Sequence, residues 1–311
     1  SYKIRELTET EKREKVTKEV AKVRLFEQAL VQNYQDYVSL LAQLARVSYT
    51  HAIGNSKITA IDTQMGHLAG KAACELSLLS LRYFNRRTEV FLIVIRRLNR
   101  KPSHEKDLEV FLQCVRTLET LLIDDAEQGD ISFDIMKIAC KSIKDKKYRI
   151  DESVLNVFLS LQILADYDPH GAKEEEKPKL RKKDRVHLLK KERKARKERK
   201  EIDEEMRKAE QTMTAEERER FQSQILKMLL TLYLEILKSG GSTGEGAHLT
   251  ASVLEGLAKF GLMANFDLLG DFLEVFREII ADLITEHSIA AANPANGRTE
   301  DFDEDIFQGV W

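Results

Sequence analysis

The sequence has few of the residues that interrupt helices or crosslink a chain. Its 311 residues include only four prolines and three cysteines. None of the prolines lies within a long apolar pattern, so long helices can run without interruption. Cys74, Cys114 and Cys140 are too few and too widely spaced for a disulfide framework or a Cys-x-x-Cys metal site. We therefore predict core thiols in a reducing compartment.

Membrane spans and catalytic motifs are also missing from the sequence. The apolar runs, such as 90–95, fall far short of the ~20 residues that a span needs. The seven histidines are scattered, without the spacing of a metal site. No nucleophile signature stands out. We predict a soluble protein that is not an enzyme, needs no cofactor or metal, and does not enter a membrane.

The apolar residues that are present follow helical spacing. A Thr-x-x-Glu capping box at Thr8 to Glu11 is followed by apolar residues in steps of three and four from Val16 to Leu44. This pattern predicts one helix of roughly 35 residues, about 50 Å long. Shorter amphipathic stretches with brief turns follow. We predict an all-α fold, a HEAT- or armadillo-like helical solenoid with a long N-terminal helix and a charged mid-chain helix.

These patterns divide the chain into five predicted parts. They are a long amphipathic helix over 1–50, a helical-repeat block over 57–166, an acidic linker with a basic charged helix over 167–213, a second helical block over 214–288 and an acidic-aromatic tail over 289–311. A second capping box, Thr214 to Glu217, predicts the start of a helix. Gly66 and Gly70 predict the close approach of a neighbouring helix.

Charge is distributed very unevenly along the chain. The basic segment, residues 177–200, carries fourteen Lys or Arg against three acids, whereas the whole chain is −2. Such side chains displace counterions from phosphates without reading base edges. No aromatic residue interrupts 177–220, so base stacking is not indicated. Apolar residues from Leu188 to Ala209 recur every seven positions, which is typical of a coiled coil.

Three roles remain open for the basic segment: contact with nucleic-acid phosphates, recognition by an import receptor, and a solvated helix that only spaces two domains. For the first role, the candidate nucleic-acid-binding residues are Lys182, Lys183, Arg185, Lys190, Lys191, Arg193, Lys194, Arg196, Lys197, Arg199 and Lys200. Structured RNA and duplex DNA both present phosphates, so the sequence does not separate them.

Aromatic residues mark two further candidate contacts. Phe302, Phe307 and Trp311 alternate with acids near the end of the chain. They fit either anchors that dock into a groove of another protein or a disordered tail. Tyr34 and Tyr37 on the first predicted helix fit either the core or a partner interface.

Three stretches of the chain together resemble a known family. They are Ser1-Tyr2-Lys3-Ile4-Arg5 leading into a capped charged helix, the mid-chain basic helix, and Val253-Leu254-Glu255-Gly256-Leu257-Ala258-Lys259-Phe260. In content and order they resemble the nucleolar complex-associated protein three family, and the resemblance covers most of the chain. Because the sequence starts with Ser in mid-pattern and the family has a further C-terminal region, we expect an internal fragment.

The resemblance implies a function that the residues alone do not give. It implies a non-enzymatic assembly factor of the nucleus and nucleolus, active in pre-rRNA processing and intranuclear transport of the precursors of the large ribosomal subunit. The implied partners are nucleolar complex protein two and the pre-ribosomal large-subunit particle, with its rRNA and ribosomal proteins. The family is also linked to replication, so a chromatin-binding factor in DNA replication initiation is the alternative.

Overall fold

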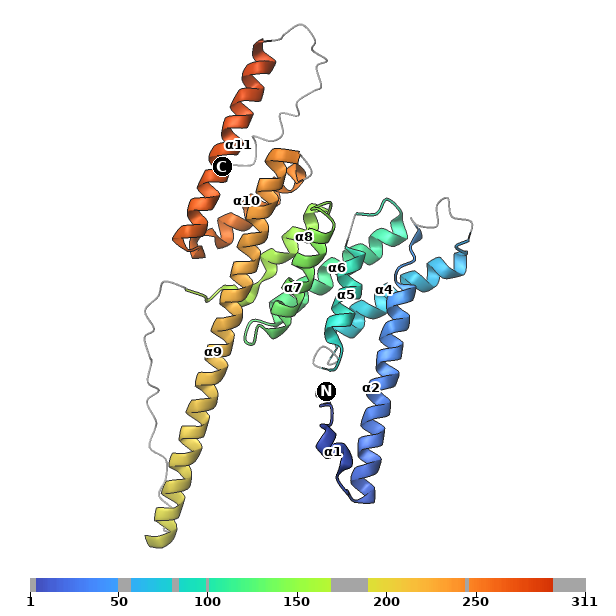
Figure 1. Ribbon diagram of the computed structural model, residues 1–311, viewed down its shortest axis with the longest axis vertical. Coiled ribbons are helices and arrows are strands. Elements are labelled where there is room, and N and C mark those ends of the chain that lie inside the picture. Colours follow the sequence, from blue (N-terminus) through green and yellow to red (C-terminus); the bar gives the residue numbers. More distant parts are fainter. Residues whose placement is uncertain are drawn as a thin grey trace. The chain divides into compact units, whose positions relative to one another are not determined.

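The chain is all-helical in the part that its structure describes. The computed structural model describes residues 4–49, 57–79, 84–98, 101–168, 190–243 and 246–292 (Figure 1). Every regular element in these ranges is a helix, which confirms the predicted fold class. The chain divides into two compact units, Ser1–Asn265 and Phe266–Trp311.

The N-terminal helix of the first unit is broken into two. Helix α1 covers Glu9–Arg13 and α2 covers Lys18–Leu44, so the prediction of one continuous helix is wrong. The predicted capping box is present, with the Thr8 backbone N–H donating to a Glu11 carboxylate oxygen at 2.8 Å. The break follows from a second cap, because the Thr17 hydroxyl accepts from a backbone N–H in the first turn of α2.

A block of packed helices follows. Its elements are α4 (Ala60–Leu78), α5 (Arg87–Arg97), α6 (Glu105–Asp124), α7 (Asp130–Asp145), α8 (Glu152–Asn156) and the 3-10 helices η2 (Val157–Ser160) and η3 (Gln162–Leu164). Helix α4 packs against α5 and α6, and α7 packs against the same two helices. Fully buried Phe91, Phe111 and Phe158 belong to the core of this block. The solenoid is compatible with these contacts and stays a prediction.

Polar side chains fix the position of α7 within the block. The Arg87 guanidinium of α5 forms ion pairs with Asp130 at 2.6 Å and Asp134 at 2.8 Å. The buried Asp125 carboxylate accepts from the backbone N–H groups of Gly129 and Ser132, at 3.1 and 2.7 Å. Burial raises the pKa of Asp125, against the effect of these hydrogen bonds. Gly129 has φ +82°, a conformation that favours glycine.

Helix α9 (Lys190–Thr243) is the longest element of the first unit. Its 54 residues span about 80 Å at the usual helical rise. It passes through Thr214, so the prediction that a helix begins there is wrong. Its C-terminal part packs against α7 and against α10 (Thr250–Phe260). The residues that it buries completely, or almost so, include Ile225, Leu229, Leu232, Tyr233, Ile236 and Leu237.

The second unit contains α11 (Phe266–Ala292). Within the described ranges, no helix is long and apolar enough to cross a membrane. The five-part division of the chain drawn from the sequence stays a prediction.

Candidate interaction surfaces

The basic segment enters α9 at its first residue. The backbone of residues 190–200 is helical, whereas the earlier candidates Lys182, Lys183 and Arg185 lie outside the described residues. The candidate residues with a described backbone are Lys190, Lys191, Arg193, Lys194, Arg196, Lys197, Arg199 and Lys200. Their assignment to nucleic-acid binding stays a prediction.

Further along, α9 is fastened to the helical block by polar contacts. The buried Gln222 amide donates to the carbonyl of Ile163 at 2.8 Å. The Arg218 guanidinium donates to the carbonyl of Ala126 at 3.1 Å. Near the other end, the Lys144 ammonium pairs with the Glu235 carboxylate at 2.8 Å. The helix that begins with the basic residues is therefore anchored in the core of the first unit.

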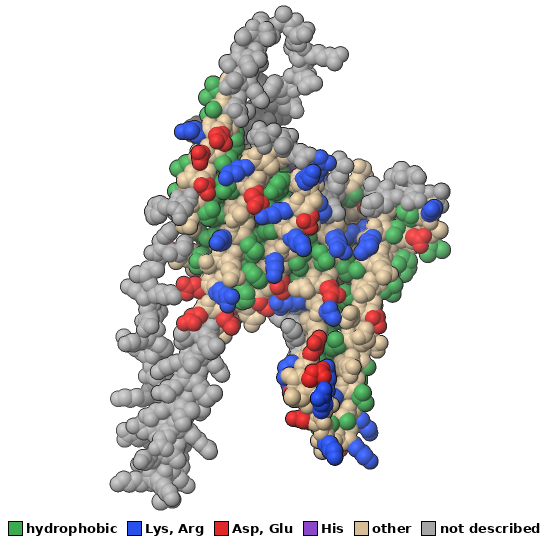
Figure 2. Space-filling model, viewed as in Figure 1, with side chains coloured by type: hydrophobic (Ala, Val, Ile, Leu, Met, Phe, Trp, Pro, Cys, Tyr) green, Lys and Arg blue, Asp and Glu red, His purple; other side chains and the backbone are tan. Residues whose placement is uncertain are grey.

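Helix α2 presents an apolar face that the described residues leave exposed. We call Val20, Val23, Phe26, Leu30 and Tyr37 the α2 apolar face. At 100° per residue these side chains lie within about one third of the helix circumference. Phe26 is 67% exposed and Leu30 is 42% exposed. Figure 2 shows hydrophobic side chains along this part of the chain.

The same face becomes buried toward the C-terminal end of α2. The buried residues of α2 are Val38 and Leu41, and α2 packs there against α4 and α5. Helical periodicity places Val38 in line with Val20, and Leu41 in line with Val23. Further toward the N-terminus α2 contacts α1, where the Arg24 guanidinium donates to the backbone carbonyl of Glu11 at 2.8 Å, whereas the side chains of the α2 apolar face stay exposed.

Tyr34 and Tyr37 illustrate this transition. Tyr34 is partly buried, and its ring meets Phe84 edge-on at 5.3 Å between centroids. Burial raises the pKa of its phenol. Tyr37 is 43% exposed. The two alternatives from the sequence thus divide between the residues: Tyr34 packs against the core and Tyr37 is available to a partner.

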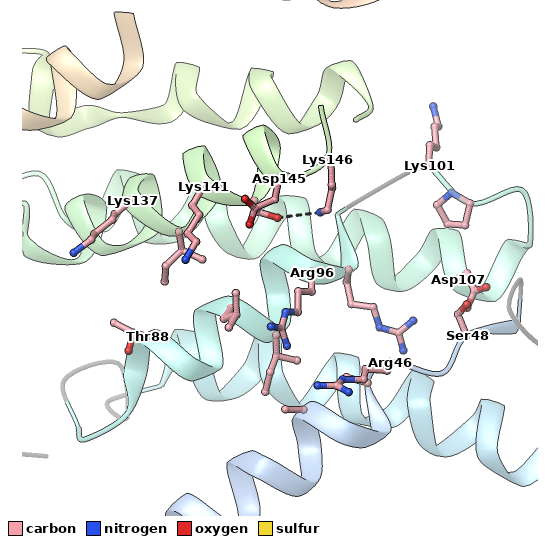
Figure 3. Close-up of a pocket in the computed structure, with 18 of the residues that line it drawn as sticks. Arg46, Ser48, Thr88, Arg96, Lys101, Asp107, Lys137, Lys141, Asp145 and Lys146 are labelled. Atoms are coloured by element: carbon pink, nitrogen blue, oxygen red, sulfur yellow. Dashed lines mark hydrogen bonds between the residues drawn. The ribbon is translucent and has the colours of Figure 1, made fainter. Parts of the chain in front are cut away.

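A hollow with a strongly basic lining lies in the first unit between the end of α2, α5, the start of α6 and α7. Its volume is about 1340 Å³. We call this hollow the cationic groove. Its basic residues are Arg46, Arg96, Arg97, Lys101, Lys137, Lys141 and Lys146, and its acidic residues are Asp107, Asp134 and Asp145. Figure 3 shows Arg46 and Arg96 reaching into the same space, with Lys141 facing it from α7.

Sequence reasoning missed the cationic groove because its charges come from separate segments. The one available signal was the spacing of Lys137 and Lys141, which places two cations on one face of a helix. The prediction of core thiols, by contrast, is confirmed, since Cys74, Cys114 and Cys140 are all buried and free. Phe302, Phe307 and Trp311 lie outside the described residues, so their role as anchors stays a prediction.

Comparison with known proteins gives consistent matches. A family model described as "Nucleolar complex-associated protein" matches residues 1–37. Nucleolar complex-associated protein 3 of Saccharomyces cerevisiae is 52% identical over 283 residues, which are 90% of this chain and 40% of that protein. The protein of the same name from Schizosaccharomyces pombe is 29% identical over 284 residues, 90% of this chain and 36% of the relative.

A mammalian relative matches the chain with similar identity and coverage. Nucleolar complex protein 3 homolog of Mus musculus is 29% identical over 287 residues, covering 90% of this chain and 34% of its own length. The chain thus spans between one third and two fifths of the length of these relatives.

Proposed function

We propose, from the premise that the chain belongs to the nucleolar complex-associated protein 3 family, that it serves as a non-enzymatic assembly factor in the biogenesis of the large ribosomal subunit. The resemblance predicted from the sequence is confirmed by the yeast and mouse relatives. Both the yeast and the mouse relative are named as nucleolar complex proteins, which confirms the predicted nucleolar, and therefore nuclear, localisation. In this role the chain joins a helical partner protein to pre-ribosomal RNA.

The α2 apolar face is the observation that carries the proposal of a protein partner. A seam that is buried beside α4 and α5 and then exposed over several turns presents side chains at the spacing of a helix-in-groove contact. A helix laid along it would extend the packing that the helical block begins. The family resemblance makes nucleolar complex protein two the partner that we propose.

Two equally exposed positions on α2 allow a matched test. Phe26 belongs to the α2 apolar face, whereas Leu25 lies on the far side of the helix, and both are 67% exposed. We expect Phe26→Asp to weaken binding of nucleolar complex protein two by about thirtyfold or more, because a buried aromatic anchor is worth about 2 kcal/mol. Leu25→Asp should leave binding within about twofold. Calorimetric titration of the 311-residue chain with that protein measures both.

The two variants, Phe26→Asp and Leu25→Asp, differ in the side of α2 that they change. Neither side chain is buried, so both variants should unfold at the temperature of the original chain. Equal binding by the two variants would show that the partner does not use this face.

The basic start of α9 supports the proposed RNA contact. The basic residues precede, on the same helix, the part of α9 that Gln222 anchors to the helical block, and clustered cations displace counterions from phosphates. The test is a chain in which Lys190, Lys191, Arg193, Lys194, Arg196 and Lys197 are changed to Gln. We expect the dependence of log K on log salt to flatten by about 0.7 to 0.9 for each phosphate that the variant no longer neutralises. Unchanged RNA binding would refute this contact, and a clear preference for duplex DNA would favour the chromatin alternative.

A further inference from the structure

Four basic side chains of the cationic groove have no acidic partner among the described residues. Arg46, Arg96, Lys137 and Lys141 are exposed, and none of them forms an ion pair or side-chain hydrogen bond with another described residue. They come from the end of α2, from α5 and from α7. These four are therefore available to an external anion.

The acids of the groove do little to neutralise them. The Asp134 carboxylate is held by Arg87, a residue outside the groove, at 2.8 Å. The buried Asp107 carboxylate accepts from the backbone N–H of Tyr49 at 3.1 Å. Only Asp145 is an exposed acid in the lining. Folding thus directs two of the three acids to internal partners.

Two other basic residues of the groove have structural contacts. The Arg97 guanidinium donates to the backbone carbonyls of Val47 and Gly66, at 3.0 and 2.5 Å, and so joins α5 to the end of α2 and to α4. The Lys146 ammonium donates to the Ser142 hydroxyl at 2.9 Å. Burial, and then the charge of Arg96, lower the pKa of Lys146 to about 8. Like charges are held together here at a cost that a bound anion would relieve.

The chemistry of the lining indicates which anion fits. A volume of about 1340 Å³ exceeds the usual range for small-molecule sites, so the groove suits part of a macromolecule. Protein partners are held mainly by aromatic or aliphatic anchors, but no aromatic side chain lines this groove, and its larger aliphatic side chains, Leu92, Ile93 and Ile138, are buried or partly buried. Several separated cations without aromatics suit a chain of phosphates, and each of the two arginines can donate to two phosphate oxygens at once.

We propose that the cationic groove is a second nucleic-acid site, which binds the sugar-phosphate backbone and is separate from the basic start of α9. The choice of RNA as its natural ligand rests on the proposed function, whereas the choice of a phosphate backbone rests on the groove itself. Two sites on one chain allow it to hold two segments of a folded RNA.

The test compares two variants of the 311-residue chain that remove equal charge. The groove variant carries Arg46→Gln, Arg96→Gln, Lys137→Gln and Lys141→Gln. The control variant carries Lys18→Gln, Lys22→Gln, Arg116→Gln and Lys227→Gln, all at exposed positions outside the groove. Binding of a structured RNA hairpin and of a duplex DNA of equal length is measured by fluorescence anisotropy between about 50 and 300 mM salt, the range over which phosphate binding weakens steeply.

We expect the groove variant to lose about three units of salt slope, and about a hundredfold in affinity near 150 mM salt, for four phosphate contacts. The control variant should change far less. Equal losses in both variants, or no loss in the groove variant, would overturn the proposal. Circular dichroism melting checks that the groove variant is folded. If it is not, the single variant Lys141→Glu is compared with its control Lys227→Glu, and equal losses of binding in both, or no loss in Lys141→Glu, would overturn the proposal.

The two nucleic acids separate this proposal from the proposed function. A groove variant that loses binding to DNA alone supports the phosphate site and counts against an RNA function. If RNA binding is lost only when the basic start of α9 is neutralised, the proposed function is supported and the proposal that the cationic groove binds nucleic acid is refuted. A chain that binds neither ligand refutes both.

Discussion

Replacement of Gly66 by Ala tests the packing that places α2 against the helical block. A Cβ atom at Gly66 would meet the backbone carbonyl oxygen of Val47 and lie 3.0 Å from that of Leu44. Both oxygens belong to the last turn of α2 and the residues after it, so neither can move aside by side-chain rotation. One of the two helices must shift, and the contacts of Arg97 with the carbonyls of Val47 and Gly66 shift with it.

The size of the effect follows from two opposed contributions. Overpacking costs about 1 to 3 kcal/mol, and a clash with backbone belongs at the upper end. Alanine recovers almost 1 kcal/mol through its higher helix propensity. We expect a net loss of about 2 kcal/mol in the free energy of unfolding, which lowers Tm by roughly 4 to 8 °C.

Two other glycines provide the comparison. A Cβ at Gly70 would lie 2.8 Å from the Val110 Cγ1 atom, which belongs to a side chain, so Gly70→Ala should cost less than about 1 kcal/mol. Nothing lies within 4 Å of a Cβ at Gly261, so Gly261→Ala should be neutral or slightly stabilising. Thermal melts of the three variants should rank Gly66→Ala lowest. A Gly66→Ala variant as stable as Gly261→Ala would refute the close approach of α2 and α4.

Further predictions concern single side chains. Because the pKa of Lys146 is lowered to about 8, the unfolded chain binds more protons between about pH 8 and 10.5, and this residue's contribution to stability rises with pH over that window. Lys146→Met should therefore be more stable than the original at pH 7, by about 1 kcal/mol after allowance for partial exposure, with the difference fading by about pH 10 in denaturant titrations. Burial raises the pKa of Cys140 to about 12, so its labelling by a thiol reagent should follow unfolding; fast labelling of the folded chain would contradict its burial. Asp125→Ala should cost about 1 to 3 kcal/mol at neutral pH, because two buried backbone N–H groups lose their acceptor, and a melt unchanged from the original would show that water replaces it.

Local signals in the sequence located most helices but not how far each extends. The capping box at Thr8 was found because both of its partners lie within four residues. The same motif at Thr214 gave a wrong start, since residues before it continue the helical pattern and α9 runs through it. The cap at Thr17 was missed because Val20, rather than an acid, stands at its third helical position, and apolar spacing continues across the break. A cap signal alone therefore does not decide whether a helix begins or continues.

The two candidate nucleic-acid sites differ in whether their basic residues are neighbours along the chain. The basic segment is evident in the sequence because its charges are neighbours along the chain, and its heptad spacing already indicated a helix. The cationic groove depends on Arg46, Arg96 and Lys141, which lie 50 and 45 residues apart and meet only when α2, α5 and α7 pack. The charge of the groove also depends on Arg87, because Arg87 pairs with Asp134 and so neutralises one acid of the lining. Replacement of Arg87 would thus act on the groove in two ways, by releasing Asp134 to pair with the groove cations and by loosening α7 from α5, both of which weaken the binding of a phosphate chain.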